Sequence, residues 1–256
     1  MPLVSAISPP ATLVVFDFDG VLVDGMAEYW WAARTAALEL APQLQLPEAV
    51  PAAFVRLRPL IHKGWEMVLM AAELGRDGFG LEVLLRDYAA GLALALARWG
   101  WQAGQLQQQL ERVRAGAIAT DEAGWLARHR FYPGVKQRLH RLAGDGAAWA
   151  VLTTKGAVFA ARLLAAEGLK PEALFGHEQG SKVVVLRQLQ AQGRRLWFVE
   201  DRRPTLEAVR ADPELASVRC CLVSWGYLGP GDGQGLPATI GWLTPERFAS
   251  PLAQWP

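Results

Sequence analysis

The sequence has few cysteines and almost no net charge. Only two of its 256 residues are cysteine, Cys220 and Cys221, and they are adjacent in an apolar segment. Such a pair cannot build a disulfide framework and lacks metal-site spacing, so we interpret both as small core residues in a reducing compartment, the cytoplasm. Lys and Arg number 26 against 25 Asp and Glu. This balance disfavours nucleic acid and anionic membranes as partners.

Long apolar runs and low-complexity tracts are also lacking. No stretch is long enough to span a bilayer. The start of the chain has no basic region before an apolar one, and Pro9 and Pro10 interrupt it, which argues against a secretory signal. Hydrophobic residues make up 52% and charged residues 20%. This is the composition of an ordered protein, long enough for a core domain with a smaller domain inserted.

Strands and helices are expected to alternate along most of the chain. Apolar, β-branched or turn-bounded runs predict strands, and Ala- and Leu-rich runs predict helices. The expected strands are 12–16, 147–152, 173–175, 195–199 and 218–223. The expected helices between them are 135–142, 157–167, 181–192 and 205–211. This order predicts an α/β fold, a parallel sheet with helices on both faces.

One long block contains no convincing strand. After the first strand, helices are expected at 26–40, 52–57, 60–74, 81–99, 106–118 and 122–128. A gap of this length between two strands is far beyond an ordinary loop, so we interpret it as an inserted domain. The expected division is a core of residues 1–24 and 131–256 with a helical insertion of residues 25–130. We expect the segment 241–255 to pack back through its aromatic residues, and assign it no chemistry.

Two carboxylates follow the first strand directly. The run Asp17, Phe18, Asp19, Gly20 and Val21 begins where the buried strand 12–16 ends. Carboxylates at such a position are costly to desolvate unless they are paired or bind a metal. Gly20 lets the chain turn sharply and lets a ligand approach the backbone. The pattern predicts Mg²⁺ beside a phosphate, with one Asp free to attack, although an ordinary Asp-Gly turn is the alternative.

Hydroxyl and cationic groups follow the later elements. The second strand, 147–152, is closed by Thr153 and Thr154, whose hydroxyl and backbone amides suit a phosphate oxygen. Lys182 opens an expected helix, where the helix dipole disfavours a lysine unless it faces anions. Lys155 competes for the same role because it directly follows Thr154. We favour Lys182.

A third strand ends in acids. The run 195–199 is followed by Glu200 and Asp201, and carboxylates there suit Mg²⁺. Since the carboxyl ends of parallel strands form the ligand edge of an open sheet, we expect these groups to lie near Asp17 and Asp19.

In this order, the motifs resemble those of the haloacid-dehalogenase-like hydrolases, most of which are aspartyl-phosphate phosphatases. The resemblance extends over nearly the whole chain up to Gly226. It implies a Rossmann-like core with an all-helical cap inserted after the first motif. The stretch Ser224, Trp225, Gly226 and Tyr227 is similar to one in phosphoglycolate-phosphatase-like members. One departure stands in the family's fourth motif, which corresponds to the acids after 195–199. Here Glu200 replaces a Gly and Thr205 replaces a later acid, so Glu200 or Glu207 would supply the second carboxylate instead.

The resemblance also implies roles for individual residues. Asp17 would be the nucleophile, Asp19 the general acid and base, and Lys182 the cation that offsets phosphate charge. Asp19 as a general acid argues against dehalogenation. The implied phosphate-binding residues are Thr153, Thr154 and Gly20, and the implied Mg²⁺ ligands are Asp17, Asp19, Asp201 and Glu200.

The helical insertion is expected to choose the substrate. Its densest cationic patch consists of Arg56, Arg58, His62 and Lys63, and we expect the last three to contact an anionic leaving group. The alternative for each residue is a solvated helix face. The expected partner is a small anionic phosphorylated metabolite such as phosphoglycolate. A β-phosphoglucomutase-like mutase and a catalytically silent binding or regulatory relative are the two alternative functions.

Overall fold

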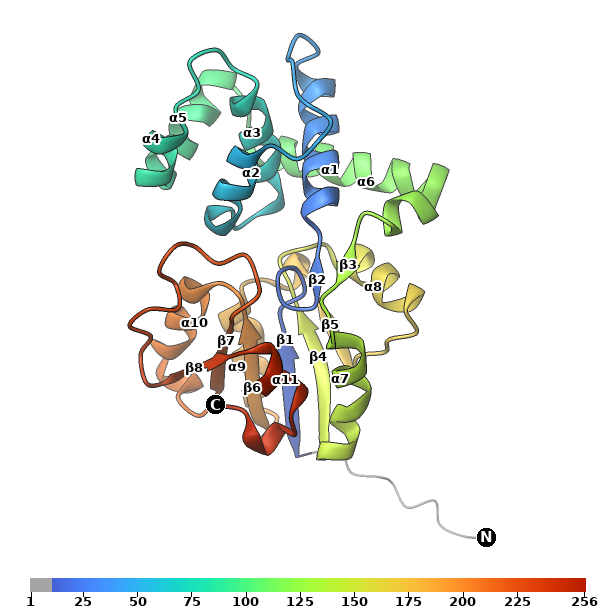
Figure 1. Cartoon of the computed structure of the whole chain (residues 1–256), viewed down its shortest axis with the longest axis vertical. Coiled ribbons are helices and arrows are strands. Elements are labelled where there is room, and N and C mark those ends of the chain that lie inside the picture. Colours follow the sequence, from blue (N-terminus) through green and yellow to red (C-terminus); the bar gives the residue numbers. More distant parts are fainter. Residues whose placement is uncertain (1–10) are drawn as a thin grey trace. The chain divides into compact units, whose positions relative to one another are not determined.

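The computed structural model describes residues 11–256 of the chain, which form two compact units (Figure 1). The first unit comprises the described chain up to Leu22 together with Phe131–Pro256, and the second is Val23–Arg130. Residues 1–10, which open the expected core range 1–24 and carry the argument against a secretory signal, lie outside the described residues.

The first unit is built on a six-stranded sheet in the order β5-β4-β1-β6-β7-β8, and every neighbouring pair is parallel. Its strands are β1 (Thr12–Phe16), β4 (Ala147–Leu152), β5 (Ala173–Phe175), β6 (Arg195–Glu200), β7 (Arg219–Val223) and β8 (Ile240–Leu243). The predicted fold class, an α/β parallel sheet with a helical insertion, is therefore confirmed. Strand β8 was not predicted.

The strand register brings three strand ends to one edge of this sheet. Phe16, the last residue of β1, lies opposite Val151 of β4 and Val199 of β6. Asp17 therefore follows β1 at the level where the two neighbouring strands, β4 and β6, also end. From β1 the chain continues to β4 on one side and later to β6 on the other. Open parallel sheets form their ligand crevice at such a switch point.

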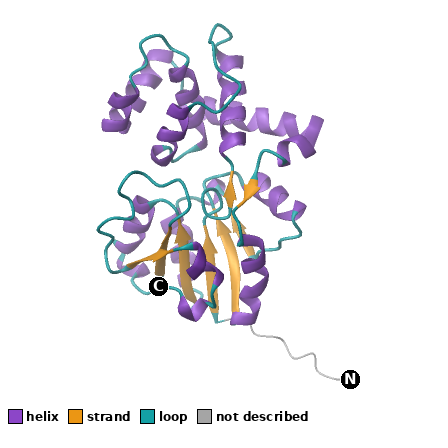
Figure 2. Cartoon of the chain, viewed as in Figure 1, coloured by secondary structure: helices purple, strands orange, loops and turns teal. Residues whose placement is uncertain are grey.

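Helices cover both faces of the sheet (Figures 1 and 2). On one face, α9 (Lys182–Gln190) and α10 (Arg203–Arg210) pack apolar side chains such as Val185 and Leu206 against the strands. On the other face lie α7 (Val135–Arg141) and α11 (Pro245–Ala249). The helix α8 (Ala157–Ala166) follows β4.

Aromatic rings from the end of the chain pack against the central strand. The Phe16 ring contacts those of Phe248 and Trp255 edge-on, with centroids 6.2 and 6.5 Å apart. Trp225 adds a further edge contact to Phe248 at 5.3 Å. The segment expected to pack back through aromatic residues does so, and its first residues also extend the sheet as part of β8.

The second unit is helical apart from its two ends. Its helices are α1 (Met26–Leu40), α2 (Ala52–Leu57), α3 (Gly64–Leu74), α4 (Leu81–Arg86), α5 (Tyr88–Trp99) and α6 (Ala103–Leu126). The chain enters through β2 (Val23–Asp24) and leaves through β3 (Arg130–Phe131), which pair as a two-stranded sheet. These two short strands were not predicted.

Three helix boundaries differ from expectation. The expected helix 81–99 is two helices, because Asp87 has φ −144° and its carboxylate accepts a hydrogen bond from the Ala90 N–H, which caps α5. The expected helix 60–74 begins only at Gly64, after a 3₁₀ turn at Arg58–Leu60. The expected helices 106–118 and 122–128 form one element, α6, that is kinked at Asp121.

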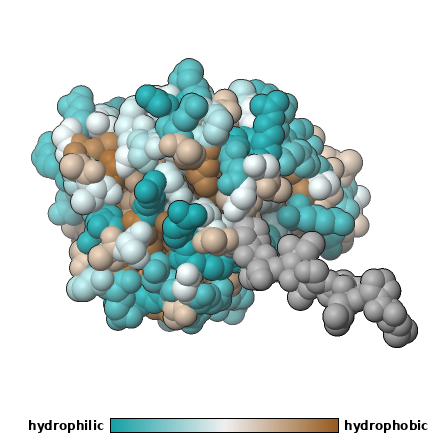
Figure 3. Space-filling view, turned by 90° about the horizontal axis from the view of Figure 1, so that it is seen from below, coloured by the Kyte–Doolittle hydropathy of each residue, from teal (hydrophilic) through white to brown (hydrophobic). Residues whose placement is uncertain are grey.

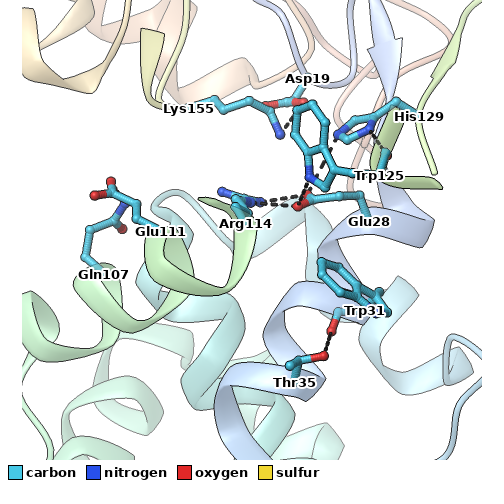
Figure 4. Close-up of polar contacts among 10 residues, drawn as sticks. All are labelled: Asp19, Glu28, Trp31, Thr35, Gln107, Glu111, Arg114, Trp125, His129 and Lys155. Atoms are coloured by element: carbon cyan, nitrogen blue, oxygen red, sulfur yellow. Dashed lines mark hydrogen bonds and ion pairs between the residues drawn. The ribbon is translucent and has the colours of Figure 1, made fainter. Parts of the chain in front are cut away.

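A buried ionic cluster joins the first and last helices of the insertion (Figure 4). The Glu28 carboxylate on α1 accepts two hydrogen bonds from the Arg114 guanidinium on α6, at 2.7 and 2.8 Å. The Trp125 indole N–H donates a third, at 3.2 Å. Glu28 and Arg114 are 0% and 3% exposed. Within a low-dielectric interior, such a satisfied pair holds the two helices in one arrangement.

The two cysteines lie in β7 as free, buried thiols, as expected of core residues. Burial raises the pKa of Cys220 to about 11 and that of Cys221 to about 12.

Hydrophilic residues cover much of the face seen in Figure 3, with separate hydrophobic patches between them. Within residues 11–256, no helix has the length and apolar character needed to cross a bilayer.

Candidate active site

The two carboxylates of the first motif emerge at the end of β1, as predicted. The Asp17 N–H donates to the Val199 carbonyl at 2.8 Å, which continues the sheet by one residue. Asp17 and Asp19 are 6% and 9% exposed. Gly20 has φ +92°, and a Cβ at this position would lie 1.9 Å from Asp201 Oδ2. Only glycine therefore allows both the turn and the close approach of Asp201.

Lys182 lies between two buried acids. Its Nζ is 2.7 Å from Asp17 Oδ1 and 2.6 Å from Glu200 Oε2. Burial alone would lower the pKa of Lys182, but these two carboxylates raise it above its ordinary value. Ser181 caps α9 through a hydrogen bond from the Val184 N–H. The cap places Lys182 in the first turn, facing anions, as the sequence indicated.

Three buried carboxylates form a cluster. One oxygen each from Asp17, Glu200 and Asp201 lies within 4.8 Å of the others. Burial, reinforced by repulsion from Glu200, raises the pKa of Asp17 to about 7. Burial, reinforced by Asp201, raises the pKa of Glu200 to about 7 as well. The alternative acid, Glu207, pairs instead with Arg203 at 2.7 Å on the surface.

This cluster fits a hard divalent cation. Its donors are all carboxylate oxygens, and burial together with repulsion among the three acids raises the pKa values of Asp17 and Glu200 despite the nearby Lys182. Oxygen-only, carboxylate-rich sites are those Mg²⁺ prefers. The Asp19 carboxylate is not one of the three clustered groups. Its expected role as a metal ligand stays a prediction.

The stretch after β7 holds Asp201 in place. This contact was not predicted from the sequence. The Tyr227 N–H donates to Asp201 Oδ2 at 2.7 Å, and the Trp225 indole N–H donates to the Val21 carbonyl at 3.1 Å. A Cβ on Gly226 would lie 2.3 Å from the Asp201 Cβ and 2.5 Å from the Gly20 carbonyl oxygen. In the sequence this stretch stood out through its similarity to phosphoglycolate-phosphatase-like members, which gave no hint of its contact with Asp201.

The end of β4 contributes a hydroxyl and a second cation. Thr153 is 3% exposed, and its Oγ1 accepts a hydrogen bond from the Lys155 N–H at 3.0 Å. Thr154 is half-buried beside it. Lys155 Nζ lies 3.5 Å from Asp19 Oδ1 (Figure 4). Each of the two lysines thus contacts a different Asp of the first motif.

The expected cationic patch belongs to the helical unit. The Arg58 guanidinium stacks over the Tyr29 ring at 4.9 Å, and Arg56 pairs with Glu82 at 2.8 Å. The His62 N–H donates to Glu66 Oε2 at 2.8 Å. Lys63 is exposed at the residue before α3. A role for Arg58, His62 and Lys63 in binding substrate stays a prediction.

Comparisons with known proteins give one family and one fold. A family model described as haloacid dehalogenase-like hydrolase matches residues 11–211. A search of curated proteins gives no match. A solved structure of a predicted phosphoglycolate phosphatase from Haemophilus somnus is 18% identical, with a TM-score of 0.60 over 93% of this chain and 94% of that one.

Two further solved structures share the fold. A predicted phosphatase from Clostridium acetobutylicum is 16% identical, with a TM-score of 0.54 over 88% of this chain and 92% of that one. Protein Tyrosine Kinase A of Mycobacterium tuberculosis is 23% identical, with a TM-score of 0.55 over 97% and 96%. At these identities the likeness concerns the fold, including the helical insertion, and is spread over almost the full length of each chain.

Proposed function

Because the chain belongs to the haloacid dehalogenase-like hydrolase family, we propose that it is a Mg²⁺-dependent phosphatase that hydrolyses a small phosphomonoester through an aspartyl-phosphate on Asp17. One observation carries the proposal. Asp17 lies at the end of β1 between Lys182, 2.7 Å away, and the carboxylates of Glu200 and Asp201. A nucleophile beside both a cation and a cation-binding cluster is suited to attack on a phosphate.

Asp17, Glu200 and Asp201 would hold the metal ion. When bound, the ion supplies positive charge for the oxygens of the phosphoryl group. The protein's own contribution is to keep the carboxylates in place. Glu200 Oε1 accepts hydrogen bonds from the N–H groups of Asp201 and Arg202, both at 3.1 Å, and Tyr227 fixes Asp201.

The reaction divides into two displacements at phosphorus. In the first, an Asp17 oxygen bonds to phosphorus, the ester bond breaks, and Asp19 gives a proton to the departing oxygen. In the second, water attacks the aspartyl-phosphate and Asp19 takes a proton from it. The bond between Asp17 and phosphorus then breaks, inorganic phosphate leaves and both carboxyl groups return to their starting states. Against the effect of burial, Lys182 lowers the pKa of Asp17 before the attack, and it offsets phosphate charge in both displacements.

The substrate we favour is a small phosphomonoester such as phosphoglycolate. The support is the stretch 224–227 after β7, together with the H. somnus structure, which is described as a predicted phosphoglycolate phosphatase. Thr153 and Thr154, at the end of β4, would bind the phosphate with the backbone at Gly20.

The test is a screen of small phosphomonoesters with Mg²⁺ and with a chelator. We expect phosphate release that requires Mg²⁺ and disappears in Asp17→Asn, because the amide cannot form the aspartyl-phosphate. Beryllofluoride, which mimics a bound phosphoryl group, should be trapped by the wild type and not by the variant. Undiminished turnover by a folded Asp17→Asn protein would refute the mechanism. Glucose 6-phosphate formed from β-glucose 1-phosphate would indicate a mutase instead.

A further inference from the structure

A second buried lysine lies at the site, on the side of the general acid. Lys155 follows β4, and its backbone is held on both sides, by its own N–H to Thr153 Oγ1 at 3.0 Å and by the His177 N–H to its carbonyl at 3.3 Å. Its side chain is 1% exposed. Burying an ammonium group is costly unless it faces an anion, so a role for its charge at the site is expected.

The two lysines are engaged differently. Lys182 lies within 2.7 Å of two carboxylates at once. Lys155 stands farther from Asp19, at 3.5 Å, which is a looser contact than a charge-assisted hydrogen bond of about 2.8 Å. Lys182 therefore contacts the proposed nucleophile and the acid cluster, whereas Lys155 contacts the proposed general acid.

The leaving group must lie beside the general acid. Under the proposed function, Asp19 reaches the ester oxygen of the departing alcohol, so a cation beside Asp19 is beside that alcohol as well. In a phosphorylated hydroxy acid, the carboxylate is only two bonds from the ester oxygen. A carboxylate at that distance from the ester oxygen would lie near the Lys155 ammonium while the phosphate stays at Asp17.

We propose that Lys155 is a specificity-determining residue that binds a carboxylate on the leaving group of the substrate. The inference rests on the proposed function and adds the residue that would recognise the carboxylate of a substrate such as phosphoglycolate. It assigns to the core unit a recognition role that the sequence had assigned to the helical insertion. The competing role is purely positional, in which Lys155 only holds Asp19 in place.

The test uses two non-hydrolysable ligands that differ in the carboxylate. 3-Phosphonopropionate, in which a methylene replaces the ester oxygen of phosphoglycolate, and propylphosphonate are titrated into the Mg²⁺-loaded protein by calorimetry. We expect Lys155→Met to weaken 3-phosphonopropionate by about 10- to 100-fold, the loss of one charge-assisted hydrogen bond, and propylphosphonate by less than about threefold. Lys155→Arg keeps the charge and should recover most of the affinity. Lys170→Met, which replaces an exposed lysine, should change neither ligand.

A second pair of variants separates recognition from positioning. In an Asp19→Asn background, Lys155→Met should still weaken 3-phosphonopropionate selectively, because the lysine contacts the ligand itself. Disappearance of the loss in that background would overturn the proposal, as would an equal loss for both ligands. A wild type that binds 3-phosphonopropionate no better than propylphosphonate would overturn it too. These are binding measurements, so failure of hydrolysis in the substrate screen would refute the proposed function without deciding the role of Lys155.

Discussion

Lys182 and Asp17 form a buried ion pair in which Nζ lies 2.7 Å from Oδ1, and the same Nζ lies 2.6 Å from Glu200 Oε2. One ammonium group therefore fixes both the proposed nucleophile and one acid of the carboxylate cluster. Replacing Lys182 by Met should lower kcat by about 10²- to 10³-fold, the typical effect of removing one charge-stabilising donor.

The control for this variant is Lys170→Met, which removes an exposed lysine and should leave kcat unchanged. Steady-state kinetics on the best substrate of the screen measures both variants. A Lys182→Met protein that binds Mg²⁺ and keeps its kcat would show that this lysine is structural only.

The acid cluster makes the stability of the metal-free protein depend on pH. Folding raises the pKa of Asp17 from 3.8, and that of Glu200 from 4.5, to about 7. Between about pH 4 and 7 the folded protein holds protons that the unfolded chain has released. The free energy that these two protonated groups contribute to folding is therefore complete below about pH 4, and it is lost as pH rises through about 7. We expect Tm without metal to fall over this range, and to fall less in Glu200→Gln. The exposed Glu207→Gln should behave like the wild type.

Adding Mg²⁺ should reverse that loss, because the ion binds the ionised carboxylates. At about 100 times its Kd, we expect Mg²⁺ to raise Tm by about 5 to 10 °C at pH 8 and by much less at pH 5. Thermal unfolding with and without a chelator checks this. An increase that is larger at pH 5 would contradict a carboxylate metal site.

Gly226 is the position where a single methyl group should disturb the site most directly. Gly226→Ala would place a Cβ 2.3 Å from the Asp201 Cβ, so Asp201 must move. We expect a loss of about 1 to 3 kcal/mol in the free energy of unfolding. Mg²⁺ affinity should fall by about 10-fold or more, as for other groups that orient a ligand.

Calorimetric Mg²⁺ titration and urea unfolding measure the two effects of Gly226→Ala. Gly116→Ala on α6 is the matched control, because a Cβ there would have no neighbouring atom within 4 Å and alanine favours a helix by up to about 1 kcal/mol. Unchanged Mg²⁺ affinity in Gly226→Ala would mean that Asp201 is not a ligand.

Within the helical insertion, the pair formed by Glu28 and Arg114 offers an internal comparison. Arg114→Met leaves the fully buried Glu28 carboxylate without its bidentate partner and should destabilise the unit by about 3 to 5 kcal/mol. Arg112→Met, two residues away on the same helix, breaks only an exposed pair with Glu39 and should cost about 1 kcal/mol or less. Hydrogen exchange of amides in α1 and α6 reports both. Equal protection of these amides in the two variants would contradict a larger stabilising role for the buried pair than for the exposed one.

Several features could be predicted because they are written in short segments of sequence. The apolar strand before Asp17, the acids after 195–199 and the lysine opening α9 each combine a local pattern with a chemical group. Parallel-sheet geometry then gathers the strand ends at one edge. The β1 pairing with both β4 and β6 fulfils that expectation for the strands.

What could not be predicted depends on contacts between distant residues or on very short elements. Strands β2 and β3 have two residues each, too few for a period to show, and β8 contains Gly241 and forms by pairing with β7. The bond between Tyr227 and Asp201 joins positions 26 apart, and Glu28 and Arg114 are 86 apart. Lys155 and Lys182 were equal in residue type, and only the folded arrangement separates their partners.

The pairing of β2 with β3 makes the helical insertion modular. Its first and last residues are neighbours, so the insertion adds more than a hundred residues while occupying one connection after β1, and the order of the six sheet strands needs none of them. A domain attached in this way can be lengthened, exchanged or replaced during evolution without changing the order of the sheet strands. The insertion and the sheet edge can then diversify as separate modules of one chain.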